Sequence, residues 1–235
     1  MKLDNATVLI TGANRGIGLA FARAVLARGA RKVYAGARDP SSITLAGVEA
    51  IRLDVTCPED VAAAVRQAGD VTLLINNAGI ASTGGFLTEG SLEAARRQME
   101  TNYFGPLRLS QGFAPVLATN GGGAILNVLS IASWISGPLL ATYAATKAAA
   151  WSLTNGLRQE LRAQGTQVLG MHMGFVDTDL TRGMDMPKTT PDEVVQRALD
   201  ALEAGADEVL ADEITQQVKR GLSAEPGVYL HALAR

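Results

Sequence analysis

A tyrosine and a lysine four residues apart are the side chains of this sequence best suited to moving a proton. On a helix, this spacing puts Tyr143 and Lys147 on one face, one turn apart. An ammonium beside a phenol favours the phenolate, so we expect Lys147 to lower the pKa of Tyr143 from about 10 toward the range useful for acid–base catalysis. Ser130 would supply a second hydroxyl for the same substrate oxygen. Taken alone, the pair is more simply explained as idle side chains on a solvated helix face, so the assignment depends on the surrounding elements.

The first of these elements is a strand, a glycine-rich loop and a helix in direct succession. Residues 6–11 form an apolar, β-rich run, residues 12–18 read Gly-Ala-Asn-Arg-Gly-Ile-Gly, and a helical pattern follows to about Arg28 with Gly29 as its C-cap. Such a junction offers backbone N–H groups and a positive helix end to a phosphate. Glycines also occur at strand–helix junctions for packing alone, but their place in a βα unit favours phosphate binding.

The residues after the second strand bear on which dinucleotide would bind. About twenty positions beyond the glycines, dinucleotide folds carry an acid for NAD or an arginine for NADP. Here the count reaches Ala37 and Arg38, and Arg15 in the glycine loop adds a second arginine. Two arginines in these places favour a 2′-phosphate, although either one alone is explained as a solvated charge. Asp39 keeps NAD open as an alternative.

The remaining pattern predicts an α/β fold in which strands alternate with helices. We expect one domain over residues 1–235, a Rossmann fold whose doubly wound parallel sheet has about seven strands and helices on both faces. The expected strands are residues 6–11, 32–37, 48–53, 71–76, 124–130, 167–171 and 208–210. The expected helices are residues 58–68, 91–119 with bends at Pro106 and Pro115, 143–162, 191–202 and 212–222.

Ligands bind at the carboxyl ends of the strands in such sheets. The glycine loop, Arg38, Asp54 and residues 76–79 all fall there, and Ser130 ends the fifth strand. Asp54 would accept a hydrogen bond from an adenine amino group, or alternatively only cap the helix that follows. Residues 177–190 are polar without a strong period, which is typical of a mobile substrate loop.

Composition excludes several kinds of function. The chain carries 21 basic and 23 acidic residues, and a net charge of −2 gives no argument for nucleic acid or for an anionic membrane surface. The single cysteine, Cys57, excludes an internal disulfide framework, and two histidines leave no Cys/His metal cluster, so no metal is expected. No signal-peptide pattern follows Met1 and no apolar run reaches the length of a membrane span, so we expect a cytoplasmic protein.

Together the motifs resemble those of the short-chain dehydrogenase/reductase family over essentially the full chain. Residues 11–18 resemble the family's T-G-x-x-x-G-x-G cofactor loop, residues 76–79 its N-N-A-G segment, and Tyr143 with Lys147 its Y-x-x-x-K motif. Each motif is weak alone, but their order and their places on the elements are specific.

This resemblance implies an NAD(P)-dependent carbonyl reductase or alcohol dehydrogenase, with NADP(H) preferred and NAD(H) possible. Tyr143 would donate the proton, Ser130 would hold the substrate oxygen, and Lys147 would bind the nicotinamide ribose. Asn102 matches the mid-helix asparagine that anchors a water relay to the lysine. Cofactor contacts are implied at Gly12, Asn14, Arg15, Gly16, Ile17, Gly18, Arg38, Asp54, Val55, Asn76, Ala78, Gly79, Tyr143, Lys147, Val176 and Thr178.

One position departs from the family. Met173 stands where the family usually has proline, and the loss of a fixed φ would either loosen the following loop or change the pocket wall. His172 beside it is interpreted as structural rather than as a second acid.

The expected substrate pocket contains Trp134, Leu139 and Phe175, which favours an apolar or aromatic ketone or aldehyde. Trp134 is alternatively a core or subunit-contact residue. Arg182 and Lys188 would suit an anionic substrate, or are simply solvated. Family members are usually dimers or tetramers, so we expect a homo-oligomer.

Three other functions fit parts of this pattern. A non-catalytic NADP-binding regulator would lack Tyr143, Lys147 or Ser130, and all three are present. A kinase-like phosphate loop would carry Lys-Ser/Thr after the glycines, where this chain has Leu19-Ala20. An epimerase or dehydratase on the same fold is not separated by these residues.

Overall fold

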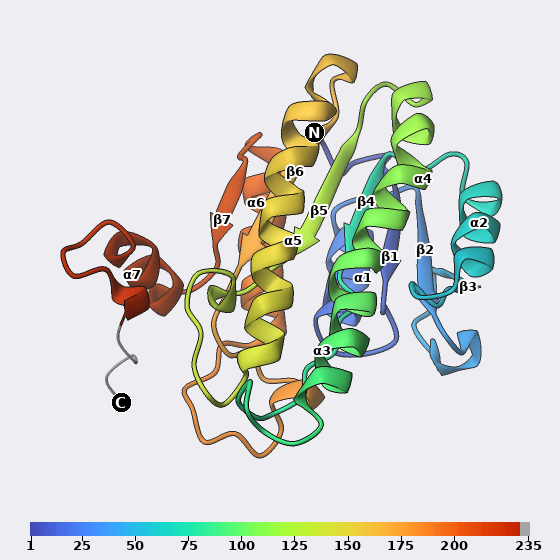
Figure 1. Ribbon diagram of the computed structural model, residues 1–235. Helices are drawn as coiled ribbons and strands as arrows, with labels where there is room; N and C mark the ends of the chain where they lie inside the picture. Colours follow the sequence, from blue (N-terminus) through green and yellow to red (C-terminus); the bar gives the residue numbers. More distant parts are fainter. Residues whose placement is uncertain (231–235) are drawn as a thin grey trace.

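A single parallel sheet organises the computed structural model, which describes residues 1–230. Its seven strands lie in the order β3-β2-β1-β4-β5-β6-β7, and every neighbouring pair is parallel (Figure 1). The order reverses between β1 and β4, which marks a doubly wound sheet and confirms the predicted fold class. The strands are β1 (Thr7–Thr11), β2 (Lys32–Ala37), β3 (Glu49–Arg52), β4 (Leu73–Asn76), β5 (Ala124–Val128), β6 (Gln167–His172) and β7 (Glu208–Leu210).

Helices cover both faces of this sheet (Figure 1). They are α1 (Gly16–Ala27), α2 (Pro58–Gln67), α3 (Ser91–Met99), α4 (Gly105–Thr119), α5 (Ala141–Glu160), α6 (Pro191–Glu203) and α7 (Glu213–Gly221). Within the described residues, none of the helices is long and apolar enough to cross a membrane.

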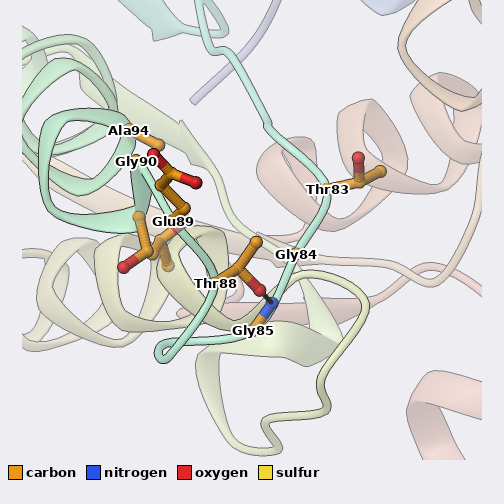
Figure 2. A pocket seen from close by; sticks show the side chains of 9 residues that line it. Thr83, Gly84, Gly85, Thr88, Glu89, Gly90 and Ala94 are labelled. Carbon is orange, nitrogen blue, oxygen red and sulfur yellow. Dashed lines mark hydrogen bonds between the residues drawn. The ribbon is translucent and has the colours of Figure 1, made fainter.

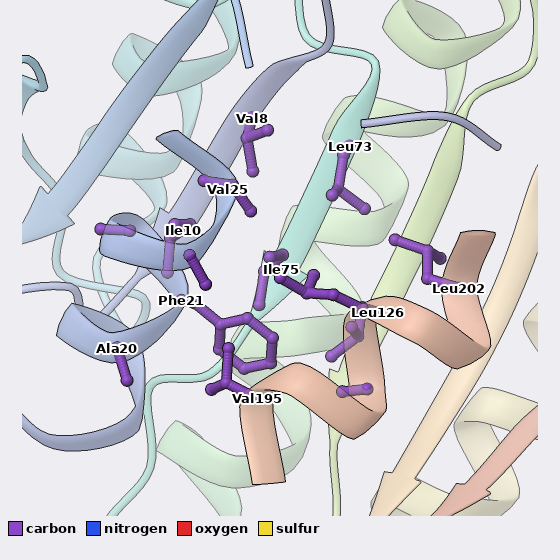
Figure 3. Close-up of a cluster of buried hydrophobic side chains, with 14 of the residues drawn as sticks. Val8, Ile10, Ala20, Phe21, Val25, Leu73, Ile75, Leu126, Val195 and Leu202 are labelled. Atoms are coloured by element: carbon purple, nitrogen blue, oxygen red, sulfur yellow. The ribbon is translucent and has the colours of Figure 1, made fainter. Parts of the chain in front are cut away.

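Two apolar cores lie on opposite faces because successive strand residues point to opposite sides. Val8 and Ile10 of β1 pack with Phe21 of α1 and with Val195 of α6, as Figure 3 shows. Leu9, between them, packs in the second core with residues of α2, α4 and α5. All five residues of β1 are buried, as expected of a parallel strand covered on both faces.

The long helix expected over residues 91–119 is divided at its middle. A π-helical segment, Glu100–Phe104, separates α3 from α4, and Pro106 lies in the first turn of α4. Proline has no N–H and its ring conflicts with the carbonyl four residues earlier, which here belongs to Asn102. Pro106 therefore accounts for the change in hydrogen bonding at this point, whereas Pro115 lies inside α4 without ending it.

Other boundaries differ from the predicted ones by a few residues. β5 ends at Val128, so Ser130 is not a strand residue but precedes a short 3₁₀ turn, Ile131–Ser133. Helix α5 begins at Ala141, two residues before Tyr143. The substrate loop contains one 3₁₀ turn, Asp179–Thr181. These shifts leave every predicted site residue at the carboxyl edge of the sheet or on a helix that adjoins it.

Candidate active site

Tyr143 and Lys147 lie in the first turns of α5, on the face that meets the end of β5. The Lys147 Nζ is 5.6 Å from the centroid of the Tyr143 ring, and it donates a hydrogen bond of 2.8 Å to the carbonyl of Val128. Lys147 is almost fully buried, while Tyr143 is half-buried. The helical spacing thus brings the two side chains together as predicted.

Ser130 completes the constellation through its hydroxyl. The Ser130 Oγ accepts a hydrogen bond of 3.1 Å from the N–H of Ala132, and its side chain lies close enough to Tyr143 to lower the pKa of that phenol. With one lone pair occupied by a backbone N–H, the hydroxyl keeps its hydrogen free to point at another oxygen. Ser133, the nearest alternative hydroxyl in the sequence, is also buried.

The predicted lowering of the Tyr143 pKa is wrong for this structure. Burial raises the pKa of Tyr143 to about 12, and the side chain of Ser130 acts in the opposite direction with a smaller effect. Burial also lowers the pKa of Lys147 to about 8. The physical reason is desolvation, which disfavours the charged form of both groups and so moves their pKa values apart, that of the phenol up and that of the ammonium down. At neutral pH Tyr143 is therefore a phenol, able to donate a proton.

Asn102 joins the segment after β4 to α5. Its Nδ2 donates to the carbonyl of Ile80 at 2.8 Å and to Thr146 Oγ1 at 2.9 Å, and its Oδ1 accepts from the N–H of Ile80 at 2.9 Å. Thr146 in turn donates to the carbonyl of Tyr143 at 2.8 Å. Asn102 is buried within the π-helical segment. It therefore holds Ile80 and the first turn of α5 at a fixed separation.

The segment 76–79 supports the glycine loop through hydrogen bonds between Asn77 and Thr11, two residues to which the sequence analysis gave no role. The Nδ2 of Asn77 donates to the carbonyls of Thr11 and Gly12 at 2.8 and 3.2 Å, and Thr11 Oγ1 accepts from the N–H groups of Asn77 and Ala78 at 3.0 and 2.9 Å. The sequence could have indicated this role, because Thr11 belongs to the T-G-x-x-x-G-x-G loop and Asn77 to the N-N-A-G segment. Their work is structural support of the loop.

The glycine loop forms a cradle that side chains would fill. A Cβ on Gly18 would lie 2.1 Å from the carbonyl oxygen of Gly12, and one on Gly12 would lie 3.2 Å from Ala78. Gly16 has a φ of +54° and faces Thr178, whose Cγ2 would be 3.4 Å from an added Cβ. The loop thus keeps its backbone N–H groups open beside the start of α1, which fits a dinucleotide pyrophosphate.

The two arginines expected at a 2′-phosphate have different surroundings. Arg15 forms an ion pair of 2.9 Å with Asp179 of the substrate loop. Arg38 is exposed, and among residues 1–230 its guanidinium has no ion-pair partner. Asp39 accepts hydrogen bonds from the N–H and the hydroxyl of Ser41 at 3.0 and 2.8 Å, so it caps the next turn. Arg38 is therefore the more available of the two cations.

Asp54 holds the turn before α2 but does not cap that helix, whose N-cap residue is Cys57. Its Oδ1 accepts from the N–H and the hydroxyl of Thr56 at 2.9 and 2.7 Å. These hydrogen bonds, with the positive charges of Arg38 and Arg52, lower the Asp54 pKa against an opposing effect of burial that is the largest single influence. Its other carboxylate oxygen remains for a ligand.

Two predicted cofactor residues point their side chains into the protein. The Nδ2 of Asn76 donates to Asn127 Oδ1 at 2.8 Å, inside the sheet, and Val55 packs in the core, close to Gly105. Only their backbones are available to a cofactor. Neither side chain can contribute a specific contact.

Met173 does not loosen the loop after β6. Its side chain is buried in the first core, and Asp212 Oδ2 accepts a hydrogen bond of 2.6 Å from the N–H of Gly174. Further along, the N–H of Asp177 donates to the carbonyl of Thr189 at 2.9 Å, and the N–H of Thr189 donates to the carbonyl of Phe175 at 3.0 Å. These contacts hold the segment carrying Val176 and Thr178.

The three expected pocket residues are not equivalent. Trp134 is half-buried and stacks on His172 at a centroid separation of 4.0 Å. This favours the alternative that Trp134 is a core residue rather than a pocket residue. Leu139 is 49% exposed, and its carbonyl accepts a hydrogen bond of 2.8 Å from the N–H of Gly84. Phe175 is half-buried at the start of the loop after β6. Leu139 therefore lies on a rim formed with the segment after β4.

Two hollows lie at this edge of the sheet. The larger, of about 350 Å³, is lined by Gly16 of the glycine loop and by residues of the substrate loop, namely Asp177, Thr178, Asp179, Arg182, Gly183 and Lys188. The smaller, of about 60 Å³, lies under residues 83–91, where Thr88 Oγ1 accepts a hydrogen bond of 3.0 Å from the N–H of Gly85 (Figure 2). Among residues 1–230, no cluster of three or more His, Cys, Asp or Glu is placed to hold a metal ion.

Comparison with known proteins agrees with this geometry. Residues 6–188 match the model of the short chain dehydrogenase family. A short chain dehydrogenase from Burkholderia cenocepacia, solved in complex with NADP, is 42% identical, with 96% of each chain covered and a TM-score of 0.92. An uncharacterized oxidoreductase of Staphylococcus saprophyticus is 30% identical over 86% of this chain and 93% of its own length. A 3-oxoacyl-(acyl-carrier-protein) reductase of Vibrio cholerae is 31% identical over 81% of each chain.

Proposed function

This chain belongs to the short-chain dehydrogenase family and is an oxidoreductase, and from that premise we propose that it transfers hydride between NADP(H) and a ketone, aldehyde or secondary alcohol. The observation that carries the proposal is the meeting of Ser130, Tyr143 and Lys147 beside the glycine cradle. A phenol, a hydroxyl and an ammonium in one place are what carbonyl reduction needs for holding and protonating oxygen.

NADP(H), when bound, supplies the hydride. The glycine loop from Gly12 to Gly18 would hold its pyrophosphate, since added side chains there would collide with the backbone. Asp54 would meet the adenine through its remaining carboxylate oxygen, and Thr178, which faces Gly16, would meet the carboxamide end. Lys147, which lies near Gly79, would contact the nicotinamide ribose.

The chain's own residues then manage the substrate oxygen and its proton. The Ser130 hydroxyl, oriented by the N–H of Ala132, donates a hydrogen bond to the carbonyl oxygen of the substrate. Tyr143 gives its phenolic proton to that oxygen as charge develops on it, and the protonated Lys147 stabilises the phenolate that results. In the reverse direction Tyr143 accepts the proton of the alcohol, so it must first be ionised.

A preference for NADP(H) is supported by the surroundings of Arg38. Its guanidinium is exposed and unpaired within residues 1–230, whereas Asp39, the acid that would favour NAD, is engaged with Ser41. The structural relative with 42% identity was solved with NADP. Replacement of Arg38 by alanine should weaken NADPH binding about tenfold, the loss of one charge-assisted contact, and leave NADH binding unchanged. Arg66→Ala, far along α2, is the matched control.

An apolar carbonyl is the substrate class best supported by the rim of the site. Large apolar side chains are exposed on the segments that follow β4, β5 and β6, including Phe86, Leu87, Leu139, Leu180 and Met186. Exposed apolar side chains gathered near one cleft indicate contact with an apolar ligand. The loop 177–190 would close over it. We also infer that the protein is cytoplasmic and forms a homo-oligomer. Light scattering after size-exclusion chromatography would test the oligomeric state.

The deciding experiment is a panel of ketones, aldehydes and alcohols, with NADPH and with NADH, followed by the absorbance of the reduced cofactor. We expect turnover of apolar carbonyls with NADPH, and Tyr143→Phe should abolish turnover while NADPH still binds with nearly unchanged affinity. Tight NADPH binding without turnover of any substrate would favour a regulatory protein instead. Full activity of Tyr143→Phe would overturn the mechanism.

A further inference from the structure

A buried imidazole contacts the backbone of Ser130 and has no part in the mechanism above. His172, the last residue of β6, is fully buried, and its Nδ1 lies 3.1 Å from the carbonyl oxygen of Ser130. The same carbonyl accepts a hydrogen bond of 3.0 Å from the N–H of Ser133. Because a carbonyl oxygen only accepts, the Nδ1 of His172 carries the hydrogen and its Nε2 is an unprotonated acceptor.

A stack of side chains fixes this ring. The indole of Trp134 lies parallel to it at 4.0 Å between centroids and 21° between planes, and Trp151 of α5 meets Trp134 edge-on at 6.3 Å. On α7, the Nζ of Lys219 lies 4.7 Å from the centroid of the Trp134 ring. The imidazole is thus held between the end of β5 and the last long helix of the described chain.

Burial, more than the charges nearby, keeps His172 neutral. Its Nε2 is 3.5 Å from Glu208 Oε1, but Lys219 binds the two oxygens of that carboxylate at 2.9 and 2.8 Å. Burial lowers the pKa of His172 to about 3, against the hydrogen bond to the Ser130 carbonyl, which raises it. The positive charges of Lys219, Lys147 and Arg158 act in the same direction as burial. The Nδ1–H is therefore a constant donor at any pH suited to an assay.

We propose that His172 is a positioning residue for Ser130, fixing its peptide carbonyl through the Nδ1–H. Ser130 has an extended backbone, with φ −163° and ψ 162°, and its carbonyl and hydroxyl are anchored separately by His172 with Ser133 and by Ala132. Without the imidazole, this peptide keeps two hydrogen bonds, from the N–H of Ser133 to its carbonyl and from the N–H of Ile131 to the carbonyl of Met173 at 2.9 Å. Loss of the third contact lets the peptide plane tilt, which shifts the Ser130 hydroxyl relative to Tyr143. The inference rests on the proposed role of Ser130 in holding the substrate oxygen.

Two substitutions of His172 separate this role from simple packing. His172→Asn keeps an N–H donor near the position of Nδ1, whereas His172→Phe keeps the ring stack on Trp134 and removes the donor. With NADPH and the best apolar carbonyl of the panel, we expect His172→Phe to lower kcat about tenfold with KM for NADPH unchanged. His172→Asn should recover most of that loss, although it disturbs the stack more. Thermal melting of both variants reports packing independently.

Either of two kinetic results would overturn the proposal: wild-type kcat in His172→Phe, or no recovery in His172→Asn. Nitrogen NMR of the imidazole tests the hydrogen bond without any substrate. The chain has only one other histidine, His231, so a His231→Gln variant assigns the signals. We expect His172 to show a protonated Nδ1, an unprotonated Nε2 and no titration between about pH 5 and 9; the opposite tautomer refutes the contact. A wild-type protein that reduces no carbonyl would contradict the proposed function instead, and would leave the NMR result to decide the contact.

Discussion

Replacement of Asn102 by alanine tests how the site is held together. Asn102 is 2% exposed, and its amide satisfies both the N–H and the carbonyl of Ile80 while donating to Thr146. Alanine leaves the two backbone groups of Ile80 without partners, and an unsatisfied buried group costs about 1–3 kcal/mol. Thr146 loses less, since it still donates to the carbonyl of Tyr143. We expect a loss of about 3 kcal/mol in the free energy of unfolding, or roughly 6–12 °C in Tm for a chain of this size.

The Asn102→Ala substitution should also lower kcat, because Ile80 and the first turn of α5 are no longer held at a fixed separation. Urea unfolding gives the change in stability, and kcat with NADPH and an apolar carbonyl gives the change in activity. Asn120→Ala is the matched control: Asn120 caps the end of α4 and its amide donates to the carbonyls of Gly69 and Val71, both at 3.0 Å. Water can replace those contacts at the surface, so we expect about 1 kcal/mol of destabilisation and unchanged kcat. The reasoning is refuted if Asn102→Ala loses no more stability than Asn120→Ala and keeps its kcat.

Two further predictions concern protonation and the glycine cradle. The pKa of Lys147 is about 8 and that of Tyr143 about 12, so kcat/KM for reduction should be level below about pH 7 and fall as the pH rises through 8. The rate of alcohol oxidation should increase with pH. A reduction profile that stays level to pH 10 would contradict this reasoning. Gly18→Ala would place a Cβ 2.1 Å from the carbonyl oxygen of Gly12, so we expect NADPH binding, measured by fluorescence titration, to be lost. Gly156→Ala, on α5 with no atom within 4 Å of an added Cβ, should bind normally and raise stability by about 1 kcal/mol.

Local sequence rules are sufficient for most of the fold. The β2 and β7 boundaries match the predicted ranges, and the parallel sheet was predicted from apolar runs separated by helix-length crossovers. The π-helical segment at Glu100–Phe104 was not predicted. Its position depends on which hydrogen bonds survive next to Pro106, and periodicity over a long window averages such a local change away.

The sequence predicts which residues lie at the site better than it predicts what their side chains contact. The end of β5 and the first turns of α5 bring Ser130, Tyr143 and Lys147 together, as the strand pattern and the helical spacing predict. Spacing could not show that the Asn76 amide turns into the sheet toward Asn127. Both orientations occur at the last residue of a strand, and only the packed neighbours decide between them.

The pKa of Tyr143 shows most clearly what residue spacing cannot predict. A spacing of four residues establishes that an ammonium lies near a phenol, and Coulomb attraction alone would then stabilise the phenolate. Desolvation depends on everything that covers the pair, and here burial is the largest influence and raises the pKa of Tyr143 to about 12, so the phenol is protonated at neutral pH. A tyrosine that holds its proton is prepared to donate it, whereas alcohol oxidation must first remove it.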